Sequence, residues 1–139
     1  IFGDTWKAVA MPLRGILSNV EQMYKREGEV GYSTNGYKVI EYLRNKNIQM
    51  DKVMMFTDCQ MWNSYGSGQT IQSEWKKYKE IAPKAKLYLF DLNGYGQSPL
   101  NLADNDVVLI AGWSDRVFDM LDSIEHGADV LDKIKEIEL

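Results

Sequence analysis

One short apolar stretch, residues 53–58, constrains the fold more than any other part of the chain. It reads Val-Met-Met-Phe-Thr-Asp, so four apolar residues run into a polar end without alternation. Such a run predicts a strand that is buried on both faces of a parallel sheet. Its last residue, Asp58, would lie at the C-terminal edge of the sheet, where open α/β sheets place their ligand sites. A turn or helix cap is the alternative role for a single aspartate there.

Two more stretches have the pattern of strands. Lys86–Leu92 is the first, and the turn Asn93–Gly96 follows it by composition. Val107–Gly112 is the second, and because it is wholly apolar we expect it to be buried. Ile1 and Phe2, followed by Gly3 and Asp4, resemble the end of a strand and its turn, so we expect further sequence upstream.

Helical spacing of apolar residues occurs before the first of these strands, between the first and the second, and after the last. It predicts helices over about 12–27 and 70–81, another that ends at the cluster 45–47, and two that finish the chain after Ser114. The residues expected to face the core are Leu13, Ile16, Leu17, Val20 and Tyr24 in the first helix; Val39, Ile40 and Leu43 in the second; Ile71, Trp75 and Tyr78 in the third; Val117, Phe118, Leu121 and Ile124 in the fourth; and Val130, Leu131, Ile134 and Ile137 in the last.

Strands that alternate with helices predict an α/β protein with right-handed crossovers and a mostly parallel sheet. The 139 residues, 45% of them hydrophobic, fit one domain over 1–139. A net charge of -4 argues against wholesale phosphate neutralisation, although a local basic face remains possible. The single cysteine, Cys59, excludes an internal disulfide, so a reduced, cytoplasmic setting is the simplest interpretation. No apolar run approaches the roughly 20 residues of a membrane span, so we expect no membrane partner.

Polar residues follow all three predicted strands and would meet at one edge of the sheet. Asp58 and Asp91 end the first two strands, and the turn 112–114 follows the third. The loop that contains Ser33 and Thr34 can reach the same edge. Carboxylates with hydroxyl groups suit Mg²⁺ or another divalent cation, because these ions prefer oxygen ligands. Two oxygen ligands alone hold a metal ion poorly, so further ligands would have to come from elsewhere.

Other residues with reactive or binding side chains give weaker signals. His126 is the only histidine and has no nucleophile-elbow sequence beside it, which favours a structural role. Cys59 directly follows Asp58, whose charge would discourage a thiolate, so packing is its expected role. Trp62 lies in a polar loop, where an aromatic residue often serves binding, although folding back onto the domain is the slightly favoured alternative. Five lysines would usually form a solvated face but could contact nucleic-acid phosphate: Lys76, Lys77, Lys79, Lys84 and Lys86.

The combination of Phe56-Thr57-Asp58 after an apolar strand with Ser33-Thr34 one helix earlier resembles a von Willebrand factor A domain. The resemblance implies a Rossmann-like three-layer α/β/α fold and a metal-ion-dependent adhesion site. In that family the site combines an Asp-x-Ser-x-Ser loop with a threonine, which Thr34 matches, and an aspartate, which Asp58 matches. More narrowly, Gly31–Gly36, Phe56–Asp58 and Ala111–Asp115 are similar to the C-terminal domain of TROVE-module proteins, the Ro autoantigen and its bacterial relatives.

This sequence departs from the family pattern in one large respect. No Asp-x-Ser-x-Ser occurs in it, and the family order would place that loop before Ile1. The resemblance therefore implies a partial domain whose first two strands and first helix are missing, with at best half a metal site. The family's strand order, 3-2-1-4-5-6, would leave the strand at 53–58 with an open edge. Such an edge pairs or aggregates, so the expected partner is an N-terminal part of the same domain or a second copy.

Three functions follow as expectations. The first is a non-enzymatic interaction module, without catalytic residues, in a Ro-like protein. Members of that family resemble RNA-binding rings, which implies noncoding RNA binding and RNA quality control by the full-length protein. The second is a Mg²⁺-dependent hydrolase or phosphotransferase with a Rossmann-like fold that uses Asp58 and Asp91. The third is an A-type domain from an unrelated adhesion or chaperone-complex protein. Ser33 and Trp62 are the candidate binding residues beside the metal pair Thr34 and Asp58.

Overall fold

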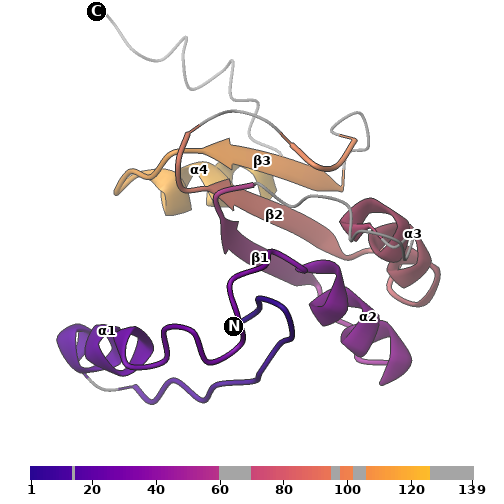
Figure 1. The fold of residues 1–139 in the computed structure, drawn as a ribbon. Coiled ribbons are helices and arrows are strands. Elements are labelled where there is room, and N and C mark those ends of the chain that lie inside the picture. Colours follow the sequence, from indigo (N-terminus) through magenta and orange to yellow (C-terminus); the bar gives the residue numbers. More distant parts are fainter. Residues whose placement is uncertain (14, 60–69, 95–97, 102–105, 126–139) are drawn as a thin grey trace, which may run out of the picture.

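The structure is a computed structural model that describes residues 1–139 except 14, 60–69, 95–97, 102–105 and 126–139. Helices and strands are mixed along the chain (Figure 1): two helices precede the first strand, one helix lies between the first and second strands, and among the described residues no helix separates the second strand from the third. In chain order the elements are α1 (Ile16–Tyr24), α2 (Tyr37–Asn45), β1 (Lys52–Thr57), α3 (Ile71–Ile81), β2 (Lys86–Asp91), β3 (Val107–Ala111) and α4 (Val117–Glu125). The last predicted helix, after residue 127, lies outside the described residues.

The three strands form one parallel sheet in the order β1-β2-β3. Met54 of β1 is in register with Tyr88 of β2, which in turn is in register with Val108 of β3. The parallel sheet and the predicted strand positions are therefore confirmed, to within a residue or two at each end. Within the described part of the chain, β1 pairs with β2 alone, so its other edge is open.

Helices α2 and α3 pack against each other on one face of the sheet. Leu87 and Leu89 of β2 point to this face, and both are fully buried. Ile40 of α2 and Tyr78 of α3 are equally inaccessible to solvent and belong to the same cluster. This side of the molecule is a two-layer core. The inward face predicted for α3 is confirmed, and that predicted for α2 is confirmed at Ile40 and Leu43, whereas Val39 is only half-buried.

Helix α4 covers only part of the opposite face. Val117 and Leu121 pack against Tyr88 and Phe90 of β2 and Ile110 of β3, all of them buried. The side chains of β1 on this face reach beyond the helix: Met54 is 42% exposed and Phe56 is 44% exposed. The expectation that this strand is buried on both faces is therefore wrong for the described chain, because no described element lies over its outer half.

Two smaller expectations about burial also fail on this side. Phe118 of α4 is half-exposed, although its spacing predicts a core position. Strand β3 is not wholly buried either, because Ala111 is exposed and Val108 is half-buried at the end strand of the sheet. Phe118 meets Trp113, and Val108 packs against the cluster under α4, but no described element covers the rest of their apolar surface.

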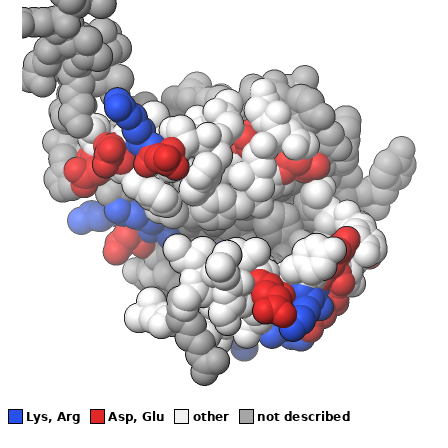
Figure 2. Space-filling model, turned by 90° about the vertical axis from the view of Figure 1, so that its left-hand side faces the viewer, with Lys and Arg blue, Asp and Glu red and all other residues white. Residues whose placement is uncertain are grey.

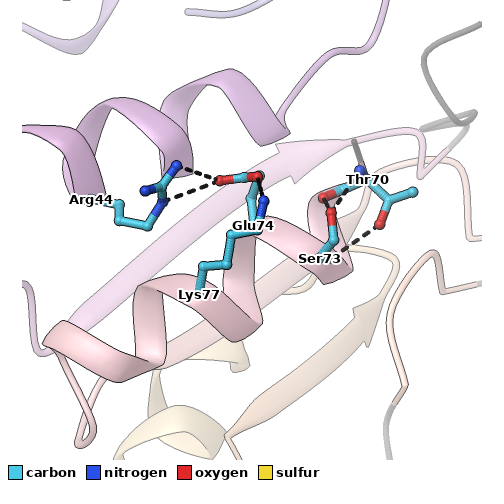
Figure 3. A network of polar contacts seen from close by, with 5 residues as sticks. All are labelled: Arg44, Thr70, Ser73, Glu74 and Lys77. Carbon is cyan, nitrogen blue, oxygen red and sulfur yellow. Dashed lines mark hydrogen bonds and ion pairs between the residues drawn. The ribbon is translucent and has the colours of Figure 1, made fainter. Parts of the chain in front are cut away.

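Helix α3 begins with reciprocal hydrogen bonds at its N-terminus. The Thr70 hydroxyl accepts from the Ser73 amide, and the Ser73 hydroxyl accepts from the Thr70 amide, both at 3.0 Å. One residue later, Glu74 is fully buried and pairs with Arg44 of α2 at 3.2 Å and with Lys77 at 2.6 Å (Figure 3). This carboxylate joins the two helices, because a buried charge must be paired and hydrogen-bonded to be tolerated.

Helix α1 is shorter than predicted and its apolar side is not buried. It covers residues 16–24, and turns occupy 25–30, where the prediction continued the helix. Figure 1 shows α1 set apart from the sheet. The apolar residues expected to face the core are each more than half exposed: Leu13, Ile16, Leu17, Val20 and Tyr24. The spacing predicted an amphipathic helix correctly, but the described chain supplies no surface for its apolar stripe.

The N-terminal residues do not extend the sheet. Phe2 forms a single antiparallel bridge with Trp6, and the Lys7 amide donates to the Ile1 carbonyl at 2.9 Å. The prediction that Ile1 and Phe2 end a sheet strand is therefore wrong for the described chain. None of the helices that the structure describes combines the length and the apolar character needed to span a bilayer.

Candidate functional site at the C-terminal edge of the sheet

The C-terminal ends of the three strands meet at one edge, as the sequence predicts. Thr57 is in register with Asp91, and Asp91 is in register with Ala111. The Leu92 amide donates to the Thr57 carbonyl and the Gly112 amide donates to the Asp91 carbonyl, both at 2.8 Å. These bonds continue the parallel ladder past the strands and fix the polar residues that follow.

Asp91 is built into the backbone of this edge. The residue is fully buried, and its Oδ1 accepts hydrogen bonds from the amides of Asn93 and Gly94, both at 3.1 Å. A carboxylate that accepts from the amide two residues later stabilises a turn in its own chain. This arrangement favours a structural role for Asp91 and leaves one of its oxygens already occupied by amides.

Asp58 follows directly after β1 and lies beside a hydroxyl group. The Thr57 hydroxyl donates to Asp58 Oδ1 at 3.4 Å and accepts from the Cys59 amide at 3.2 Å. Cys59 itself has a φ of 56°, in the left-handed region that residues with a side chain seldom adopt. The chain therefore turns sharply here, and the half-buried Asp58 carboxylate is held close to the strand end.

Cys59 is unsuited to nucleophilic chemistry. Burial, followed by the charges of Asp91 and Asp58, raises the pKa of its thiol from 9.0 to about 11. The thiolate is the reactive form of cysteine, so at neutral pH this residue is present as the neutral thiol. The prediction that neighbouring carboxylate would discourage a thiolate is confirmed.

Ser33 is engaged by a residue that sequence reasoning did not single out. The Ser33 amide donates to Asp4 Oδ1 at 3.2 Å, and the Ser33 hydroxyl donates to the same oxygen. Lys38 of α2 donates to the Asp4 carbonyl, and the Asn35 amide donates to the Gly3 carbonyl at 3.3 Å. Asp4 thus anchors the loop before α2, and Ser33 has a described role in that anchor.

Glycines allow this approach of the N-terminal turn to the loop. Gly31 has a φ of +80°, and a Cβ added to it would lie 2.0 Å from Asp4 Oδ2. A Cβ on Gly3 would lie 2.4 Å from the Gly31 carbonyl oxygen. A side chain at either position would displace the turn. The two glycines are the signal in the sequence that two segments of backbone come close at this point.

Thr34 lies between this anchor and α2, and its carbonyl accepts from the Gly36 amide at 2.9 Å. Helix α2 leads into β1 through the short connection 46–51, so the helix and the strand run in opposite directions. The loop before α2 therefore faces the same edge of the sheet as Asp58. Joint metal ligation by Thr34 and Asp58 stays a prediction. Among the described residues, no three His, Cys, Asp or Glu side chains are grouped to hold a metal ion.

An aromatic cluster beside this edge was missed by sequence reasoning. The rings of Phe56 and Phe90 are stacked with centroids 4.4 Å apart, and Trp113 lies 5.9 Å from Phe56. Phe118 of α4 meets Trp113 edge-on at 5.8 Å. Trp113 and Phe118 are each 54% exposed, so the cluster presents rings to solvent. The sequence interpretation placed Trp113 in a polar turn and took Trp62 as the exposed aromatic; Trp62 and His126 lie outside the described residues.

Figure 2 looks onto this side of the molecule. Among the described residues in that view, acidic and basic side chains gather together at the upper left and at the lower right, acidic ones also lie at the upper right, and white areas separate these groups. In the lower part of the view, at the height of α1, a white area is bordered on its right by acidic and basic side chains, and the white area is in accord with the exposed apolar stripe of that helix. The edge therefore combines carboxylates with apolar and aromatic surface, which is a poor complement for a phosphate backbone.

Comparisons with known proteins give a likeness of fold. The structure is similar to the crystal structure of the Deinococcus radiodurans Ro (RSR) protein, with a TM-score of 0.65 and 14% sequence identity. The match covers 92% of this chain and 25% of that protein, so the chain spans a quarter of its length. No family model and no curated protein matches the sequence. At this identity the likeness establishes a shared α/β Rossmann-like fold.

Proposed function

We propose that this chain is a non-enzymatic interaction module of a Ro-like RNA-binding protein. The observation that carries the proposal is the fold shared with the Ro protein of Deinococcus radiodurans over 92% of the chain. The motifs Gly31–Gly36, Phe56–Asp58 and Ala111–Asp115, which resemble TROVE-module proteins, lie on the elements that this fold aligns at one edge of the sheet. RNA binding, in this proposal, belongs to the full-length protein and its noncoding RNA partners.

The module acts by contact rather than by chemistry. Its described C-terminal edge offers a neutral thiol at Cys59 and a carboxylate at Asp91 that is bonded to backbone amides. The exposed surface beside it is apolar: Met54 and Phe56 on β1, then Trp113 and Phe118. Exposed apolar patches of this kind mark interaction sites. The partner for this surface and for the open edge of β1 is the preceding part of the same domain or a second copy.

Metal belongs to the complete form of this module. In the family pattern, Thr34 and Asp58 would supply two oxygen ligands, and an Asp-x-Ser-x-Ser loop would supply the others. Hard cations such as Mg²⁺ need several oxygen ligands and retain water, so the described residues alone would hold the ion weakly. The chemistry the ion would supply is charge neutralisation at the contact with a partner's carboxylate.

A Mg²⁺-dependent hydrolase or phosphotransferase is the second candidate, because two aspartates follow adjacent parallel strands. In such an enzyme, Asp91 would bind metal or substrate through its second oxygen while Oδ1 stays bonded to the amides. The interaction module asks nothing of Asp91 beyond its role in the turn.

Two measurements test the proposal. The full-length gene product is crosslinked to RNA in its own cells and the bound RNA is sequenced; small noncoding RNAs should be enriched over a mock capture. Separately, the purified chain with Mg²⁺ is assayed against p-nitrophenyl phosphate and nucleotides, with Asp58→Asn as the matched variant. We expect no turnover above buffer. Metal-dependent turnover that Asp58→Asn abolishes, or a capture without RNA, would replace the interaction module by the enzyme or by an A-type domain of another kind.

A further inference from the structure

A cavity of about 920 Å³ opens at the other end of the sheet, where β2 and β3 begin. Its floor is apolar and comes from the core: Trp75, Ala85, Leu100 and Val107 are all buried. Its rim is basic, with side chains from α3, from the turn after it and from the first residue of β2. The lysines among the lining residues are Lys76, Lys79, Lys84 and Lys86.

One of these lysines has a structural role. Lys79 pairs with Asp106 at 3.2 Å and donates to the Ala85 carbonyl at 2.7 Å. Its ammonium group also lies 6.0 Å from the centre of the Trp75 ring. Asp106 in addition accepts from the Trp75 indole at 3.2 Å. Asp106 is the only acidic residue among the described lining residues, and these contacts occupy it.

The other three lysines have no such partner. Within the described chain, Lys76, Lys84 and Lys86 make no ion pair and no side-chain hydrogen bond. A lysine in the last turn of a helix can be explained by the helix dipole. Lys84 and Lys86 lie beyond the end of α3, so this explanation does not reach them. Lys86 is half-buried and stands in register with Lys52 of β1, a neighbour of like charge.

We propose that this cavity binds adjacent phosphate groups, those of an RNA strand or of a nucleoside polyphosphate, through Lys76, Lys84 and Lys86. Lysine can pair with phosphate without a fixed geometry, because its ammonium group is a compact charge at the end of a flexible side chain. The apolar floor excludes water beneath the charges and so strengthens their attraction for an anion. The volume lies in the upper part of the range of about 300–1,000 Å³ for ligand sites and exceeds what one phosphate fills.

The inference does not rest on the proposed function. The cavity and the C-terminal edge of the sheet lie at opposite ends of the same strands. The rim of the cavity is basic, whereas the C-terminal edge carries the carboxylates of Asp58 and Asp91. A phosphate ligand at the basic end would leave the C-terminal edge free for a protein contact. The two sites can therefore be tested, and can fail, independently.

The experiment measures binding of a fluorescein-labelled oligouridylate by anisotropy, and of ATP without metal by calorimetry, to the wild-type chain and two triple variants. The first variant is Lys76→Gln, Lys84→Gln, Lys86→Gln. The second, Lys7→Gln, Lys25→Gln, Lys46→Gln, makes the same change in net charge away from the cavity. Thermal unfolding checks that both remain folded, and Lys84→Gln, an exposed turn position, is the fallback if the first does not fold.

We expect the cavity variant to bind at least about tenfold more weakly, and the control to bind within about twofold of wild type. Three phosphate contacts predict a salt slope near −2, so affinity for the RNA should fall roughly 20-fold between about 50 and 200 mM salt. Stronger binding of the oligonucleotide identifies an RNA strand as the ligand, and stronger binding of ATP identifies a polyphosphate. Equal losses in the two variants, or no binding of either probe at low salt, would overturn the proposal.

Discussion

The two faces of the sheet differ in how completely the chain covers them. On one face, α2 and α3 bury Leu87, Leu89 and Met55 in a continuous core. On the other, α4 covers β2 and β3, while Met54 and Phe56 of β1 remain exposed. The strand β1 thus has one face covered by helices and one face open to solvent. Parallel sheets are normally covered on both faces, so the open face of β1 is where this fold has room for a partner.

An apolar run shows that a strand is suited to burial, but it does not show which part of the structure covers the strand. Residues 53–56 are apolar on both sides of the strand, and the pattern alone predicts burial of both. The described chain provides a cover for one side. Apolar residues on the other side are what a covering partner would require, and the exposed stripe of α1 repeats the observation in a helix.

The largest expected effect separates two identical substitutions on adjacent residues. Met55 is 3% exposed on the covered face, and Met54 is 42% exposed on the open face. Met55→Ala should lower the free energy of unfolding by about 2–5 kcal/mol, because it leaves a cavity in a packed core. At a dilution where the chain is monomeric, Met54→Ala should cost less than about 1 kcal/mol, since its side chain then meets solvent. Urea denaturation of both variants measures the difference.

The pair of substitutions is its own control, because strand, residue type and deleted volume are the same. Equal costs at that dilution would mean that Met54 is covered within a single chain, and would contradict the open face. A Met54→Ala cost that grows with protein concentration would reveal a partner on this face.

Much of the covered half of the molecule is predictable from sequence. Local patterns specify α3, where Trp75 and Tyr78 recur on one face and Thr70 caps the start. The burial of Glu74 is not predictable, because its partner Arg44 lies 30 residues away and on another helix. Asp4 and Ser33 are separated by a similar distance in the chain, and only their glycine neighbours hint that they meet.

The candidate site also has one part that the sequence predicts and another that it does not. The meeting of Asp58 and Asp91 at one edge follows from three apolar runs in a parallel sheet, and sequence reasoning reaches it. The exposed rings of Trp113 and Phe118 depend on which surface lacks a cover, which no local pattern encodes. Ligation by Thr34 and Asp58 rests on resemblance to a family, and remains a prediction.

The second prediction concerns the C-terminal end of β1, where the half-buried thiol of Cys59 lies beside the open face. At pH 8, a pKa of about 11 in place of 9.0 leaves roughly a hundredth of the usual thiolate fraction. Cys59 should therefore react with iodoacetamide roughly a hundredfold more slowly than a free cysteine peptide. Because the raised pKa disfavours the charged form, the rate should climb about tenfold per pH unit up to the pKa.

Asp58→Asn should speed this reaction only modestly, since burial is the main cause of the raised pKa and Asp58 is the least of its three causes. Mass spectrometry of the alkylated protein over time gives both rates. A Cys59 that reacts at the rate of the peptide would mean that the end of β1 is as open as its outer face, and that Asp91 and Asp58 do not form the edge described.

The most direct test of the account is the association state of the purified chain, measured by light scattering over a range of concentrations. If the open face and edge of β1 take a partner, the wild-type chain should associate, and Met54→Lys should remain folded but become monomeric, because a charge there cannot be buried without a counterion. The control Lys46→Gln should associate like the wild type. A stable wild-type monomer at every concentration, with the amides of β1 protected from hydrogen exchange within one chain, would contradict the account.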